Sequence, residues 1–117
     1  MENARAICLV LTTWPADGDA DGAARQLVDE GLAACVQVGA PVISYYGWEG
    51  RRERGDERPL TIKTVRGQVP ALEARLQALH PYELAEFVVL DAEASAGYAA
   101  WVAGWVEAGG ADPPGAR

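Results

Sequence analysis

Three side chains in this sequence are of the types that hold a soft or borderline metal ion. Cys35 supplies a thiol, His80 the only imidazole, and Glu83 a carboxylate. Cu(I) prefers thiolate ligands, whereas Cu(II) and Zn(II) accept imidazole and carboxylate. No two of these residues have a spacing that defines a metal site. Metal ligation is therefore one hypothesis; the alternative is that Cys35 faces the core and His80 ends a helix, where positive charge is favourable.

A second set of residues could line a ligand cleft. It combines aromatic rings, carboxylates, one amine and the imidazole: Tyr46, Trp48, Glu49, Lys63, His80 and Glu86. We expect such a set to hold a small anionic or metal-chelated ligand at a subunit boundary. Lys63 is informative because it stands among apolar residues on an expected strand. Its alternative role is to reach solvent or to pair with Glu49 or Glu86.

The sequence does not indicate an enzyme. It has one histidine, no serine nucleophile elbow and no glycine-rich phosphate loop. A Cys35–His80 nucleophilic pair is the remaining catalytic hypothesis. It is disfavoured because Cys35 lies between apolar neighbours, without the electropositive setting that lowers a thiol pKa.

Composition excludes some partners. The 117 residues carry a formal net charge of −7. The basic cluster Arg51, Arg52, Arg54 and Arg58 is interleaved with the acidic residues Glu53, Asp56 and Glu57, so we expect no nucleic-acid partner. No apolar run is long enough for a membrane span, so we expect no membrane partner. The chain has two cysteines, which we expect to be reduced thiols and not a disulfide, and we therefore expect a cytoplasmic location.

The chain alternates between strand and helix patterns. We expect strands over residues 6–12, 32–48, 58–65 and 87–90, the second interrupted at Gly39-Ala40-Pro41 and followed by a charged reversal over 49–56. Helices are predicted from an aspartate-rich start at 17–21 to about Glu30, over 68–79, and from Ser95 to a stop before Gly109-Gly110.

This order predicts an α+β, ferredoxin-like βαββαβ domain with a long β2–β3 hairpin and an extra C-terminal helix. Right-handed crossovers place the two main helices on one face of an antiparallel sheet. The other face should be bare and apolar, which favours self-association. We place the domain at residues 1–108 and a flexible tail at 109–117, where turn-forming residues gather.

Five short motifs in the sequence together resemble those of one known protein family. They are Leu32-Ala33-Ala34-Cys35-Val36, Tyr46-Gly47-Trp48-Glu49-Gly50, Ile62-Lys63-Thr64, His80-Pro81-Tyr82-Glu83 and Tyr98-x-x-Trp101. In this order, over about residues 6–107, they resemble the CutA family of divalent-cation tolerance proteins. Two departures are Thr12-Thr13, where some members have a cysteine, and Leu84-Ala85-Glu86, where a proline often precedes the glutamate.

The resemblance implies a homotrimer with lateral clefts, tolerance to divalent cations (chiefly copper) as its function, and a likeness to PII signalling proteins. Two hypotheses follow. In the first, the chain is a non-enzymatic trimer that binds a divalent cation. In the second, it is a PII-like signalling or scaffold trimer that binds a small metabolite or a protein partner in its inter-subunit clefts.

Overall fold

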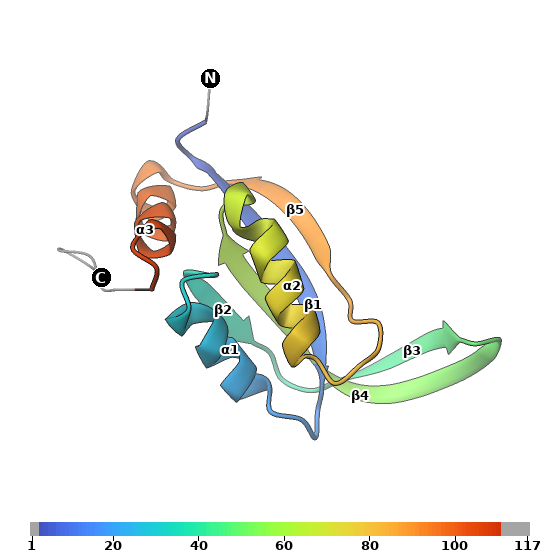
Figure 1. Cartoon of the computed structure of the whole chain (residues 1–117). Coiled ribbons are helices and arrows are strands. Elements are labelled where there is room, and N and C mark those ends of the chain that lie inside the picture. Colours follow the sequence, from blue (N-terminus) through green and yellow to red (C-terminus); the bar gives the residue numbers. More distant parts are fainter. Residues whose placement is uncertain (1–2, 111–117) are drawn as a thin grey trace.

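A computed structural model describes residues 3–110 of the chain. Within these residues, five strands and three α-helices follow one another, with a short 3₁₀ turn before the second helix (Figure 1). Their order is β1 (Ala6–Pro15), α1 (Ala20–Asp29), β2 (Cys35–Val38), β3 (Val42–Trp48), β4 (Arg51–Thr64), η1 (Arg66–Gln68), α2 (Val69–Leu79), β5 (Val88–Glu93) and α3 (Ala96–Glu107).

One antiparallel sheet contains all five strands. Its order is β2-β4-β1-β5, and β3 pairs with the outer half of β4. β2 and β3 together form the second strand of a βαββαβ unit, broken at Gly39-Ala40-Pro41 as the sequence predicted. This arrangement confirms the α+β, ferredoxin-like fold.

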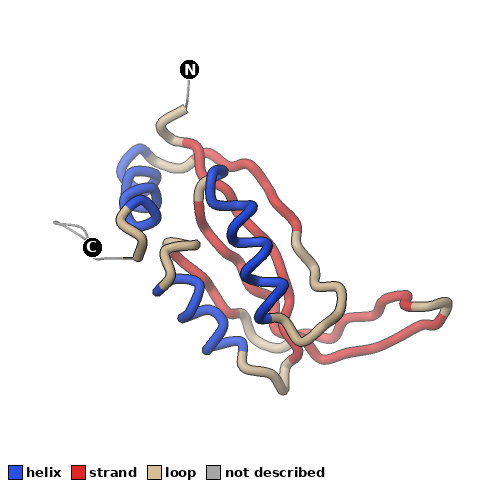
Figure 2. The backbone as a smooth tube through the Cα atoms, in the orientation of Figure 1, coloured by secondary structure: helices blue, strands red, loops and turns tan. Residues whose placement is uncertain are grey.

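The main core lies between the sheet and the helices α1 and α2, which cover the same face (Figure 2). Each helix has a distinct start: the Asp19 side chain accepts a hydrogen bond from the Gly22 N–H, and Pro70 occupies the first turn of α2. The fully buried side chains of this core include Val10, Leu27, Leu60, Ile62, Leu72 and Leu76.

β3 and the first half of β4 form an arm that projects beyond the rest of the sheet (Figure 1). The predicted charged reversal over residues 49–56 was wrong, because the turn consists of Glu49 and Gly50 alone, both at positive φ (51° and 76°). Two such residues make a type I′ turn, whose twist matches the flanking strands. The charged residues from Arg51 onward therefore belong to β4 and point alternately to the two sides of the arm.

Two other strands are longer than predicted. β1 continues past Thr12 to Pro15, because its last residues pair with β4 as far as Glu57 and the Trp14 ring is buried in the core. A proline is tolerated at such a strand end. β5 continues to Glu93, since its last three residues pair with the start of β1.

The sheet face opposite α1 and α2 is not wholly bare, which corrects the prediction. α3 packs on one end of it, where Ala99 and Val102 contact Ile7 and Ala34 in a second core cluster. Farther along this face, Val88 and Leu90 of β5 stay 44% and 46% exposed. α3 therefore leaves an apolar part of the face uncovered.

Gly109 and Gly110 end α3 in an ordered turn. Their N–H groups donate to the carbonyls of Val106 and Trp105, the pattern of a Schellman motif. Residues 111–117 of the predicted flexible tail lie outside the described residues, so the domain boundary stays a prediction. Within the described part, no helix is both long enough and apolar enough to cross a membrane.

Candidate functional site

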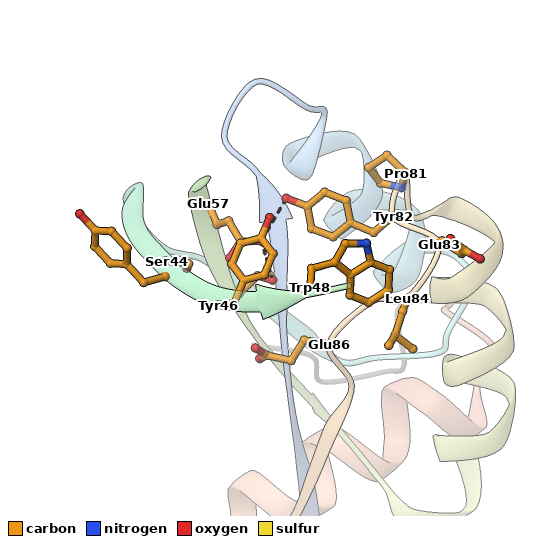
Figure 3. A pocket seen from close by; sticks show the side chains of 11 residues that line it. Ser44, Tyr46, Trp48, Glu57, Pro81, Tyr82, Glu83, Leu84 and Glu86 are labelled. Atoms are coloured by element: carbon orange, nitrogen blue, oxygen red, sulfur yellow. Dashed lines mark hydrogen bonds between the residues drawn. The ribbon is translucent and has the colours of Figure 1, made fainter. Parts of the chain in front are cut away.

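A cavity of about 630 Å³ opens where the base of the arm meets the segment between α2 and β5 (Figure 3). The arm contributes aromatic side chains, β1 and β4 contribute the floor, and the segment after His80 forms the opposite wall. The lining residues are Thr13, Ser44, Tyr45, Tyr46, Trp48, Glu57, Pro81, Tyr82, Glu83, Leu84 and Glu86. The volume lies within the usual range for small-molecule sites.

A buried carboxylate forms part of the cavity floor. Glu57 is only 8% exposed, and its Oε2 accepts hydrogen bonds from the Thr13 hydroxyl at 3.2 Å and the Tyr82 hydroxyl at 3.0 Å. The contact between Tyr82 and Glu57 is drawn in Figure 3. The two hydroxyls fix the orientation of the carboxylate and join β1, β4 and the segment after α2 at one point.

Tyr82 titrates at unusually high pH. Burial, followed by the hydrogen bond to Glu57, raises the pKa of the Tyr82 phenol from 10.0 to about 12. Burial disfavours the phenolate, and the nearby carboxylate repels it. The neutral phenol is therefore the form that donates to Glu57 throughout the physiological range.

This pKa predicts an alkaline loss of stability. Because the pKa in the folded state exceeds the unfolded one, the neutral phenol stabilises the fold fully below pH 10 and loses that effect as pH rises towards 12. Relative to Tyr82→Phe, the unmodified chain should thus become less stable over this window, as measured by urea unfolding. The exposed Tyr45→Phe is the matched control; if it changes the pH dependence equally, Tyr82 is not the responsible group.

His80 lies behind the cavity wall, not in its lining. The imidazole is 8% exposed and packs against Trp14 and Tyr82, with ring centroids 4.2 Å and 4.8 Å away. Its Nδ1 accepts from the Tyr82 N–H at 3.0 Å, so Nε2 carries the proton and donates to the Thr13 carbonyl at 2.7 Å. Both ring nitrogens are occupied, which leaves no lone pair for a metal ion in this arrangement.

The predicted cleft residues are only partly brought together. Tyr46, Trp48 and Glu86 line the cavity. Glu49 lies instead at the tip of the arm, beside a second hollow of about 550 Å³. Lys63 lies on the partly open sheet face, with its Nζ 5.6 Å from the centre of the Tyr98 ring.

The predicted metal ligands are separated within one chain. Glu83 lines the cavity, His80 is buried behind it, and Cys35 starts β2 opposite Lys63. Among residues 3–110, no three histidine, cysteine, aspartate or glutamate side chains gather as a metal site would require. Cys8 is buried, and this burial raises the pKa of its thiol, so it offers no ready thiolate. Metal ligation thus remains a prediction that one chain alone does not satisfy.

Sequence reasoning missed the centre of the cavity, formed by Thr13, Glu57 and Tyr82. Glu57 was counted only as one of the acidic residues that offset the arginines around it. Tyr82 was part of a recognised motif, and that motif was the one signal that could have directed attention to it. Thr13 had been considered only as a position where relatives carry a cysteine.

Fold and site together define a ferredoxin-like α+β domain with a ligand-sized cavity at the base of a projecting hairpin. The model of the CutA1 divalent ion tolerance protein family matches residues 8–104. The divalent-cation tolerance protein CutA of Thermus thermophilus is 39% identical over 95 residues, which cover 80% of this chain and 92% of that protein. The chain belongs to the CutA1 family.

Solved structures agree with this assignment. The Cut A1 structure from Thermus thermophilus superposes with a TM-score of 0.80 at 37% identity, covering 84% of this chain and 96% of that one. A structure titled a PII-like protein CutA from Nostoc gives 0.77 at 35% identity, covering 83% and 94%. The human protein CutA is 37% identical over 87 residues, covering 74% of this chain, but the match spans 49% of its length.

Proposed function

We propose that this chain acts as a divalent-cation tolerance protein, that it works as a homotrimer without catalysing a reaction, and that copper is its principal ion. The observation that carries the proposal is the family match over residues 8–104, which includes nearly every strand and helix. The family is named for tolerance to divalent ions, not for a reaction. The free thiols Cys8 and Cys35 support a location in the reducing cytoplasm.

Exposed apolar surface supports the trimer. Val88 and Leu90 on the sheet face, and Ile43 on the arm, are between 44% and 54% exposed in a single chain. Val88 and Leu90 lie two residues apart on the same face of β5, and exposed apolar patches are typical of protein–protein contacts. Neighbouring copies that pack on these surfaces would remove them from water.

The trimer also bears on metal binding. Since the candidate ligands of one chain do not converge, a copper site would combine ligands from neighbouring copies. Cys35 suits this role because it is half-buried and starts β2, at the edge of the sheet. Its thiol is of the type that favours Cu(I).

Calorimetric titration of the chain with Cu(I), Cu(II) and Zn(II) tests the proposal. We expect saturable copper binding tighter than about 1 mM, which corresponds to about −4 kcal/mol, and a weaker Cu(I) affinity in Cys35→Ser. Cys8→Ser, which changes the buried thiol, is the matched control. If none of the three ions shows saturable binding, direct metal binding by this chain is refuted.

A second candidate function rests on the cavity. A space of about 630 Å³ with aromatic walls and a polar floor is suited to a small metabolite. The Nostoc relative is titled a PII-like protein, which fits a trimer that signals the presence of a ligand. In this candidate function the chain binds a metabolite, and its effect on metal tolerance is indirect.

A further inference from the structure

The charges around the cavity all have one sign. Among residues 3–110, three carboxylates line it, those of Glu57, Glu83 and Glu86, and no lysine, arginine or histidine does. An anion would be repelled by these groups and would meet no positive partner. The cavity therefore does not suit the small anionic ligand that the sequence suggested.

Aromatic rings form much of the remaining surface. Tyr45, Tyr46, Trp48 and Tyr82 all line the cavity, and Tyr46 and Trp48 are 46% and 38% exposed. The face of an aromatic ring carries negative potential and attracts a cation. Indole and phenol rings together with carboxylates make a surface that recognises positive charge on an apolar body.

The Glu57 carboxylate can accept further hydrogen bonds. Glu57 is more than nine-tenths buried, yet only its Oε2 accepts hydrogen bonds. Among residues 3–110, its Oε1 accepts no hydrogen bond and the carboxylate has no ion-pair partner. Oε1 is not fully enclosed, because Thr12 Oγ1 is the one fully buried side-chain polar atom without a partner in that part of the chain. The cavity next to Glu57 is where a cationic partner would fit.

We propose that the cavity binds a small organic ammonium ion, so that the ammonium group lies against Glu57 and the alkyl groups contact the rings of Tyr46 and Trp48. This inference rests on the second candidate function, because it names the class of ligand for that cavity. A bare divalent metal is a poorer occupant: the aromatic side chains offer only neutral phenol oxygens, and within residues 3–110 the acidic side chains do not converge as a metal site requires.

A matched pair of probes tests the inference. Choline and its uncharged carbon analogue 3,3-dimethylbutanol have nearly the same shape and differ in charge. Titrated into the ¹⁵N-labelled chain at low salt, each is followed by the indole N–H signal of Trp48, assigned by its loss in Trp48→Leu. We expect choline to bind at least about tenfold more tightly than the alcohol.

Two variants locate the charge responsible. Glu57→Gln keeps the size and an acceptor for Thr13 and Tyr82 but removes the charge, so choline affinity should fall about tenfold while the alcohol is unaffected. Glu53→Gln makes the same change four residues away on β4, outside the cavity lining, and should leave choline affinity intact.

The outcomes separate the two proposals. Equal binding of both probes, or equal losses in Glu57→Gln and Glu53→Gln, overturns the inference. The inference is also overturned if choline does not bind to a chain that light scattering shows to be an intact trimer and that still binds copper. In that case the proposed tolerance function is unaffected. Loss of the trimer in Glu57→Gln would show that a neighbouring copy occupies the cavity, and would overturn it as well.

Discussion

Leu90→Arg is expected to convert the proposed homotrimer into a monomer. Leu90 is 46% exposed in one chain and lies beside Leu9 on the sheet face that α3 leaves uncovered. Burial of a guanidinium there, without an opposing charge, would cost several kcal/mol for each copy. Light scattering should show a fall in mass from three times 12.4 kDa to 12.4 kDa.

The control for this prediction changes the other side of the sheet. Ala71→Arg introduces the same charge on the exposed side of α2, away from the proposed contact surface, and should remain a trimer. Circular dichroism should show that both variants keep the native helix content. If Leu90→Arg remains a trimer in micromolar solution, this face is not the contact surface.

The fold could be predicted because local signals agree with one another. Asp19 and Ser95 begin helices with their side-chain caps, and both were identifiable as capping residues in the sequence. The break at Gly39-Ala40-Pro41 was predictable, since proline cannot donate to a ladder. Local features of this kind depend on a few neighbouring residues and not on distant parts of the chain.

The arm and the cavity were harder to predict because they depend on pairing between distant residues. The run from Arg51 to Asp56 looks like a charged loop, yet β3 holds it as a strand through pairs such as Tyr46 with Glu53. The buried state of Glu57 depends on Thr13, which is 44 positions away, and on Tyr82, which is 25 away. No periodicity within one segment reports such contacts.

His80→Ala is expected to lower the free energy of unfolding by about 2–4 kcal/mol, since it leaves two part-buried backbone groups without their hydrogen-bond partner. These groups are the Thr13 carbonyl and the Tyr82 N–H, and the His80 imidazole forms a hydrogen bond with each of them. The variant also removes the ring packed against Trp14. Urea unfolding at one fixed protein concentration measures the effect, because the stability of the proposed trimer depends on concentration.

The same position separates a structural role from metal ligation. The amide of His80→Gln can still donate to one of these backbone groups or accept from the other, so it should recover part of the lost stability. Under the proposed function, neither variant should change the copper affinity of the folded trimer more than about twofold, which is below the tenfold change that corresponds to about 1.4 kcal/mol. A copper affinity that falls in both variants while the fold remains stable would instead make His80 a ligand. Since both ring nitrogens are engaged within the chain, the geometry favours the structural role of His80.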